Sequence, residues 1–208
     1  MSTRCSPATS SCSRACPSRS RCATIRDNLR LPSGEGRSNP KTLAFARTLR
    51  RAHRDDQAFI DAVLDWFHKE RFFYTLAPPL LGANSVDGFL FETRRGFCEH
   101  YAGASVVLLR AAGIPARVVT GYQGGTINPN GNYMIVRQSD AHAWAEVWLA
   151  QRGWVRVDPT AAVAPERIEY GADAVRRLAR QGAAFGQLEA EAVRRALSLG
   201  WLEKLTRQ

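Results

Sequence analysis

The chain passes at Arg95-Gly96-Phe97-Cys98-Glu99-His100-Tyr101 from an irregular stretch into a helical pattern that continues to Ala112. The apolar positions of this pattern recur at the i, i+4 and i+7 spacing, and the small residues between them allow close packing against a sheet. Gly113 fits the position after a helix end, and Pro115 prevents the helix from continuing. The sequence therefore predicts a helix over 98–112 that begins at a cysteine.

The segments around this helix follow the order of an α+β fold. Helical spacing predicts a short basic helix over 41–52 and a second helix opened by Asp55-Asp56, and the aromatic stretch 71–76 indicates a short strand. Residues 80–97 look irregular, with one helical turn near 86–91. After the central helix we expect four strands, at about 116–122, 132–138, 143–149 and 154–158. Helices followed by antiparallel strands favour α+β over a wound parallel sheet.

The two ends of the chain differ in composition from its middle. We expect a disordered or irregular leader over 1–40, with Asn39-Pro40 as a linker at its end. Residues 41–170 hold the predicted elements of one domain, and residues 171–208 are expected to form a helical C-terminal extension with helices over 172–182 and 186–205. The leader contains four cysteines whose spacings match no zinc or disulfide pattern, so no role is predicted for them: Cys5, Cys12, Cys16 and Cys22.

Charge and hydropathy narrow the class of protein. The net charge is +10, but the basic excess lies largely in the two ends and no nucleic-acid-binding motif is present, so we expect no nucleic-acid partner. No stretch approaches the roughly 18 apolar residues of a membrane span, and the N-terminus lacks the apolar run of a secretory signal. Whether the leader is a misplaced start or part of a longer chain is left open.

Cys98 is placed where a nucleophilic thiol would be. A thiol attacks carbonyls as thiolate, so its ordinary pKa of about 8.5 has to be lowered. The first turn of a helix does this with unpaired backbone N–H groups and the positive end of the helix dipole, and the same N–H groups can stabilise an oxyanion. Gly96 leaves the chain free to turn into the helix. The alternative for a lone cysteine is a small buried apolar residue.

One histidine and one aspartate on the predicted strands support the interpretation of Cys98 as a nucleophile. Alternate residues of a strand share a face, so His142 lies on the face of Trp144. If the following turn centres on Gln151, Asp158 lies across from Trp144 and diagonal to His142, about 7–8 Å away along the sheet. A slip of one residue would move Asp158 to the opposite face. In this register Asp158 would orient the imidazole, and His142 would take the proton of the Cys98 thiol.

The remaining histidines are weaker candidates. His100 is two residues from Cys98 on the same helix and therefore points about 200° away from it around the axis. His53 and His68 lie in polar N-terminal helices and are expected to be solvated. A zinc site from Cys98, His100 and His142 lacks a fourth ligand, so no metal or other cofactor is expected.

Two further residues share the predicted face of His142. Glu146 is either a second polar residue of the site or the partner in an ordinary salt bridge. Trp144 is first a residue that packs the sheet, and it is also placed to form a wall of an acyl pocket. The sequence leaves both alternatives open.

Four blocks of the chain, taken in order, resemble the core of the transglutaminase-like superfamily. They are Arg95-Gly96-Phe97-Cys98-Glu99-His100-Tyr101-Ala102, Gly113-Ile114-Pro115-Ala116-Arg117-Val118-Val119, Asp140-Ala141-His142-Ala143-Trp144-Ala145-Glu146-Val147 and Gly153-Trp154-Val155-Arg156-Val157-Asp158-Pro159-Thr160. Within this family the sequence is most similar to bacterial membrane-anchored proteins, in which the domain faces the periplasm between transmembrane segments. The resemblance implies a papain-like fold, with the cysteine helix packed on a small antiparallel sheet.

The resemblance also implies a site and a reaction. It assigns the nucleophile to Cys98, the base to His142 and the orienting carboxylate to Asp158. The implied reaction forms a thioester from a glutamine carboxamide of a protein or peptide, releases ammonia, and passes the acyl group to a lysine amine or to water. The alternatives are a cysteine peptidase or amidase with the same triad, and an inactive scaffold that binds a peptide.

The sequence departs from the resembled family in two ways. The transmembrane segments of that family are missing, which leaves localisation open and makes a membrane-embedded remainder of a longer chain a possible partner. No cluster of acidic residues suggests a calcium site, so no dependence on calcium is expected.

Overall fold

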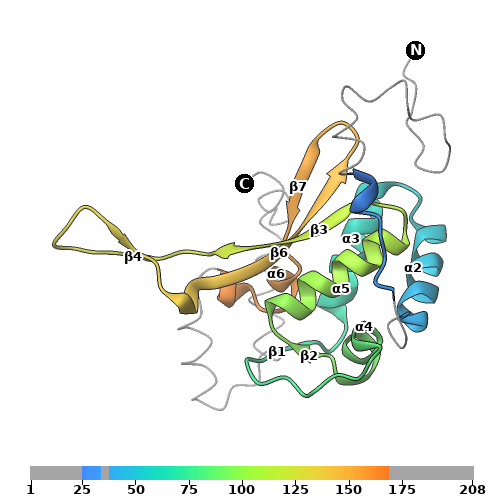
Figure 1. The fold of residues 1–208 in the computed structure, drawn as a ribbon, viewed down its shortest axis with the longest axis horizontal. Helices are drawn as coiled ribbons and strands as arrows, with labels where there is room; N and C mark the ends of the chain where they lie inside the picture. Colours follow the sequence, from blue (N-terminus) through green and yellow to red (C-terminus); the bar gives the residue numbers. More distant parts are fainter. Residues whose placement is uncertain (1–24, 34–37, 169–208) are drawn as a thin grey trace.

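Helix α5 (Cys98–Ala111) is the centre of the fold. The computed structural model describes residues 25–33 and 38–168, and in it α5 lies between a three-stranded antiparallel sheet and a layer of helices (Figure 1). The sheet has the order β3 (Ala116–Tyr122), β6 (Ala141–Leu149), β7 (Gly153–Val157). Helix α5 packs mainly on the central strand β6. The predicted α+β architecture, with the cysteine-bearing helix on a small antiparallel sheet, is confirmed.

The segments before α5 form the helical layer and a short parallel ladder. Helices α2 (Pro40–Ala52) and α3 (Asp56–Lys69) match the predicted ones, and Asp55 caps α3 by accepting a hydrogen bond from the Ala58 N–H at 3.0 Å. The predicted aromatic strand is shorter than expected: only β1 (Phe73–Tyr74) forms, paired in parallel with β2 (Arg95–Gly96). The turn expected near 86–91 belongs to a longer helical stretch made of α4 (Ser85–Asp87) and a π-helical segment η1 (Gly88–Thr93). A short helix, α6 (Thr160–Val163), follows β7, and the described residues end in a further helical stretch over 165–168.

Aromatic rings fill the core beside α5. Tyr101 is fully buried, meets the edges of Phe89 and Phe67 at 5.0 and 5.7 Å between ring centroids, and donates from its hydroxyl to the Phe73 carbonyl at 2.9 Å. Phe72 joins the same cluster against Phe67 at 4.9 Å. Burying aromatic rings in edge-to-face pairs is among the larger apolar contributions to stability. Because Phe73 belongs to β1, this cluster also fixes β1 against the cysteine helix.

Asn39 is a buried capping residue, and the interpretation of Asn39-Pro40 as a linker was wrong. Asn39 has a left-handed backbone with φ of 46° and accepts hydrogen bonds from the N–H groups of Val86 and Asp87. In return, the Asp87 carboxylate accepts from the Thr42 N–H at 2.7 Å and the Thr42 hydroxyl at 2.5 Å. The first turns of α2 and α4 therefore satisfy each other's unpaired groups, an arrangement between distant segments that composition cannot reveal.

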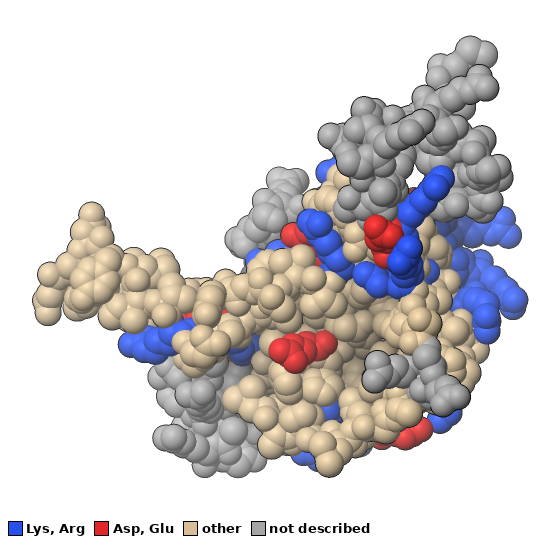
Figure 2. Space-filling view, viewed as in Figure 1, with Lys and Arg blue, Asp and Glu red and all other residues tan. Residues whose placement is uncertain are grey.

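The prediction of a strand over 132–138 was largely wrong. Only β5 (Met134–Ile135) forms there, and it pairs with β4 (Thr126–Ile127) in a hairpin that projects from the sheet (Figure 1). Strand β6 already has β3 and β7 as neighbours, so the sheet has no place beside β6 for a further strand. Figure 2 shows the projecting hairpin without charged side chains along most of its length. Three apolar residues of the segment, Tyr133, Met134 and Val136, remain exposed instead of joining the core.

The two ends of the chain are described only in part. Asn28 accepts a hydrogen bond at its carbonyl from the Ala116 N–H at 3.0 Å, and the Arg30 carbonyl accepts from Arg110 at 2.7 Å, so this stretch lies against the domain. The four leader cysteines and the helices expected over 172–182 and 186–205 lie outside the described residues, and the domain boundaries at 40 and 170 stay predictions. Within the part of the chain that is described, no helix is long and apolar enough to cross a membrane.

Candidate active site

Cys98 is brought to the site by the short ladder between β1 and β2. Strand β2 ends at Gly96, and Cys98 is the first residue of α5, with 7% of its surface exposed. A Cβ at Gly96 would lie 2.7 Å from the Cβ of His100 and 2.9 Å from the Phe89 ring. The expectation that Gly96 provides backbone freedom was therefore wrong in its reason: its φ is not positive, and glycine is needed because these side chains pack directly on the backbone.

The register of β6 and β7 brings Asp158 to the imidazole of His142, as predicted. Trp148 pairs with Trp154 and Ala145 with Val157, so the turn centres on the expected residue and Asp158 follows directly after β7 on the face of His142. The Nε2–H of His142 donates to Oδ2 of Asp158 at 2.7 Å, and both side chains are buried. This pairing fixes the tautomer that leaves Nδ1 with the lone pair.

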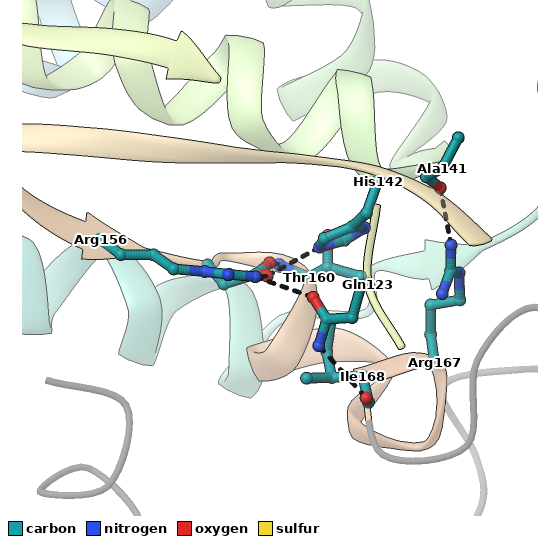
Figure 3. Close-up of polar contacts among 8 residues, drawn as sticks. Gln123, Ala141, His142, Arg156, Thr160, Arg167 and Ile168 are labelled. Carbon is teal, nitrogen blue, oxygen red and sulfur yellow. Dashed lines mark hydrogen bonds and ion pairs between the residues drawn. The ribbon is translucent and has the colours of Figure 1, made fainter. Parts of the chain in front are cut away.

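Further contacts hold the Asp158 carboxylate in place. Its Oδ1 accepts from the Thr160 N–H at 3.2 Å, and its Oδ2 also accepts from Nη2 of Arg156 at 3.2 Å (Figure 3). The Arg156 guanidinium lies over the Trp144 ring at 4.2 Å, and Trp144 in turn stacks beside His142 at 6.2 Å. Trp144 therefore covers the histidine and supports the arginine that contacts its carboxylate partner.

The charges around the thiol and the imidazole favour their ionised forms. Burial alone would raise the pKa of Cys98, but hydrogen bonds from the His142 side chain and the backbone N–H of Ala143, together with the charges of His142 and Arg167, lower it. Burial alone would lower the pKa of His142, but hydrogen bonds with Asp158 and Cys98 and their negative charges raise it. Opposite shifts of this kind favour a thiolate–imidazolium pair. Nδ1 of His142 has no nitrogen or oxygen partner among the described residues, so it is available to the thiol.

Two residues that the sequence analysis did not single out also lie at this site. The pKa of Tyr74 is raised to about 12, chiefly by burial and also by the nearby Cys98, while Arg167 and the backbone of Cys98 act against this rise through hydrogen bonds. Arg167 is 2% exposed and donates from Nη2 to the Ala141 carbonyl at 2.8 Å (Figure 3). Neither residue carries a local motif, and only the fold brings them to the cysteine.

The other three histidines, which were weaker candidates for the site, lie in different surroundings from His142. His100 packs on Phe97 and Phe89 at 4.6 and 5.5 Å, and burial lowers its pKa. His68 is half-buried with Nδ1 3.1 Å from the Ala162 carbonyl, so the expectation that it is solvated was wrong. His53 is also only partly exposed. Across residues 25–33 and 38–168, no three His, Cys, Asp or Glu side chains gather into a group that could hold a metal ion.

Glu146 is the partner in a salt bridge, one of the two alternatives left open for it. Its Oε2 accepts from Nε and Nη2 of Arg117 at 2.9 and 2.7 Å. The guanidinium of Arg117 also lies over the Trp154 ring at 4.2 Å. Glu146 therefore belongs to a salt bridge on the outer face of the sheet.

Comparison with known sequences gives a family and a close relative. The family profile of the transglutaminase-like superfamily matches residues 43–159. The sequence is 59% identical over 144 residues to protein-glutamine gamma-glutamyltransferase of Pseudomonas aeruginosa, a match that covers 69% of this chain and 21% of that protein. The chain thus spans about a fifth of the curated relative.

Comparison with solved structures agrees with this result. The fold is similar to the periplasmic domain of TgpA from Pseudomonas aeruginosa, with a TM-score of 0.70 and 56% identity, over 74% of this chain and 52% of that one. A candidate cysteine protease from Cytophaga hutchinsonii shares the fold with a TM-score of 0.50 and 24% identity, over 68% of this chain and 44% of that one. The second similarity bears on the fold alone.

Proposed function

Since the chain belongs to the transglutaminase-like superfamily, we propose that it is a thiol acyltransferase of transglutaminase type with Cys98, His142 and Asp158 as its catalytic triad. The observation that carries the proposal is the buried His142–Asp158 hydrogen bond of 2.7 Å, on an imidazole that interacts with the thiol at the start of α5. The name of the Pseudomonas aeruginosa relative supports the choice of reaction.

The first half of the reaction forms a thioester. The Cys98 thiolate attacks the carbonyl carbon of a glutamine side-chain carboxamide and gives a tetrahedral intermediate with a negative oxygen. The His142 imidazolium then gives its proton to the leaving nitrogen, so that ammonia departs as the C–N bond breaks. Asp158 keeps the imidazole in the required tautomer and stabilises its charged form.

The second half transfers the acyl group. A lysine amine of a second polypeptide, or water, attacks the thioester, and neutral His142 takes the proton of the attacking group. The thiolate leaves, which restores the starting thiolate–imidazolium pair. We assign this activity to a catalytic domain over residues 41–170, acting on protein or peptide substrates.

Incorporation of a fluorescent primary amine into a glutamine-containing protein tests the proposal. The wild-type chain is expected to incorporate the amine and release ammonia, and Cys98→Ala is expected to lose both because no thioester can form. A variant with the four leader cysteines replaced by serine is the matched control and is expected to stay active. Incorporation by Cys98→Ala would refute the assignment of the nucleophile.

Two other results would replace the proposal with a different function. Peptide cleavage without amine incorporation would indicate a cysteine peptidase that uses the same triad. A Cys98 that reacts with iodoacetamide no faster than a model thiol at pH 6 would indicate an inactive scaffold, because an activated cysteine is already thiolate at that pH.

A further inference from the structure

The outer edge of β3 carries backbone N–H groups that no described residue uses. Strand β3 lies at one side of the three-stranded sheet and pairs only with β6. The Ala116 N–H points away from β6, since it donates to the Asn28 carbonyl at 3.0 Å. Successive N–H groups of a strand alternate in direction, so those of Val118, Thr120 and Tyr122 also point to this outer edge. Within 25–33 and 38–168, these three groups have no hydrogen-bond acceptor.

The sequence of this edge lacks the usual protection of an exposed strand. An edge strand ordinarily carries charged side chains or a proline, because its unpaired groups would otherwise recruit another chain. Residues 118–122 contain neither, and the uncharged sequence continues through the projecting hairpin to 136 (Figure 2). Such a concentration of apolar surface marks a site that binds a partner. This segment holds six of the nine large apolar residues that are exposed in the described part of the chain: Val118, Tyr122, Ile127, Tyr133, Met134 and Val136.

The unpaired edge lies beside the thiol. Thr120 pairs with Ala143 across the sheet, and Ala143 packs with Cys98 in a small buried cluster. Paired residues of an antiparallel ladder share a face, so the exposed side chains of Val118, Thr120 and Tyr122 lie on the same face of the sheet as Cys98. A strand added to β3 would lie about 4.8 Å further out. Its side chains on this face therefore have the width of one strand to cross before they reach the cluster.

On the basis of the proposed acyl transfer, we propose that the polypeptide that donates the glutamine binds as an extended strand along the outer edge of β3. Its carbonyls accept hydrogen bonds from the N–H groups of Val118, Thr120 and Tyr122, and its own N–H groups donate to the carbonyls of the same residues. Alternate side chains of the donor contact Val118 and Tyr122, and the glutamine extends on the same face towards Cys98. Because this edge has no charge, it suits an uncharged segment of high β-propensity.

Ammonia release by the full chain from two glutamine substrates tests this mode of binding. The first substrate is an acetylated peptide amide of alternating valine and threonine with a central glutamine. The second is acetylglutamine amide, which has no neighbouring residues that could pair with β3. We expect a lower KM for the peptide, because only the peptide can use the N–H groups of the edge. The small substrate reports whether the thiol and its neighbours are intact.

Methylation of one backbone nitrogen of the peptide at a time maps its contact with β3. Each methyl group removes one N–H donor, and only alternate N–H groups of an added strand face β3. KM is therefore expected to rise about 3- to 10-fold at every second position and less than about twofold at the positions between them. We expect kcat to stay unchanged, because these hydrogen bonds hold the substrate and the transition state equally. The unaffected positions are the internal control.

Variants of β3 test the same contact from the side of the protein. Thr120→Pro removes an N–H that points outward and leaves the ladder with β6 intact, a position at which an edge strand tolerates proline. It is expected to raise KM for the peptide about 3- to 10-fold and to change KM for acetylglutamine amide less than about twofold. Thr120→Ala keeps the N–H and is the matched control. Tyr122→Ser is expected to raise KM for the peptide several-fold through lost apolar contact, whereas Leu80→Ser, at a fully exposed leucine away from β3, is expected to leave it unchanged.

Three results would overturn the inference. They are a methylation profile without alternation, a Thr120→Pro variant that uses the peptide as well as the wild type does, and a dimer in solution that Thr120→Pro converts to a monomer, which would assign the edge to a second copy of the chain. If Thr120→Pro loses activity toward both substrates, its fold is disturbed, and the methylation profile on the wild type decides. A wild-type chain that releases ammonia from neither substrate would instead count against the proposed acyl transfer.

Discussion

Replacing Asp158 by asparagine tests the contribution of charge to the proposed triad. Both carboxylate oxygens accept hydrogen bonds: Oδ2 from His142 and Arg156, and Oδ1 from the Thr160 N–H. Asparagine offers one oxygen and one NH₂ group in the same volume. The substitution therefore removes the negative charge and places the NH₂ group of asparagine against one of these N–H donors. The packing of the side chain is unchanged.

The structure sets the size of the expected effect. A hydrogen bond to a charged group contributes about 1.5–3 kcal/mol and a neutral one about 0.5–1.5 kcal/mol, so loss of the charge costs about 1.4 kcal/mol, or roughly tenfold in rate. The opposed pair of donors costs about 1–3 kcal/mol. This second cost falls on the reaction if the NH₂ group faces His142, and on folding if it faces Thr160. In Asp158→Asn we therefore expect kcat/KM to fall about 10-fold if the NH₂ group faces Thr160, and about 60- to 1,700-fold if it faces His142.

The pH dependence of kcat/KM in amine incorporation, read together with urea unfolding, provides the assay. The negative charge of Asp158 helps to raise the pKa of His142, so its removal is expected to move the basic limb of the profile to lower pH. Asp65→Asn makes the same chemical change at an exposed pair with Lys69 and is expected to alter neither the rate nor the profile.

The reasoning fails if Asp158→Asn keeps kcat/KM within threefold of the wild type, or if the basic limb does not move. The first result would mean that the His142 tautomer is fixed by other groups. The second would mean that a group other than the imidazolium controls that limb. A loss of activity that is matched by a loss of folded protein would assign Asp158 to stability instead, and the unfolding measurement distinguishes this case.

One glycine and one residue that caps a helix start give further predictions. A Cβ at Gly121 would lie 2.9 Å from the Trp144 ring, so Gly121→Ala is expected to displace the tryptophan, lower kcat/KM several-fold and cost about 1–3 kcal/mol in urea unfolding; unchanged kcat/KM would mean that Trp144 does not support the site. Asp87→Ala removes the charged acceptor of the Thr42 N–H and hydroxyl, and is expected to cost about 3 kcal/mol of unfolding free energy while Cys98 alkylation in the folded protein is retained; a loss below about 1 kcal/mol would show that the two helix starts do not depend on this contact.

The sequence could predict where Cys98, His142 and Asp158 lie because each position depends on local pattern. Cys98 begins a helical period, His142 has a face set by strand alternation, and Asp158 has a register set by a short turn. Tyr74 and Arg167 were not predictable in this way. Tyr74 reaches the site through a two-residue parallel ladder, and Arg167 through side-chain contacts to distant backbone. Such placements follow from tertiary packing, which has no periodic signature in the chain.

Tertiary packing also explains two of the predictions that were wrong. The stretch 132–138 has the composition of a strand, but β6 is already paired on both sides, so the stretch forms a hairpin that projects from the sheet. Asn39-Pro40 has the composition of a linker, but two helix starts bury Asn39 as a shared cap. In both cases local propensity was correct about the residues' preferences, and the available partners decided the outcome.

In the proposed thiolate–imidazolium form of the site, the charged groups alternate in sign. Arg167 lies beside the Cys98 thiolate, the thiolate beside the His142 imidazolium, the imidazolium beside Asp158, and Asp158 beside Arg156. Each internal charge has an opposite neighbour on both sides, so the cost of burial is shared along the series. Removing one of the arginines leaves an anion with a single partner, whereas removing one of the inner groups leaves two like charges as neighbours. Losses at the inner positions should therefore exceed those at the ends.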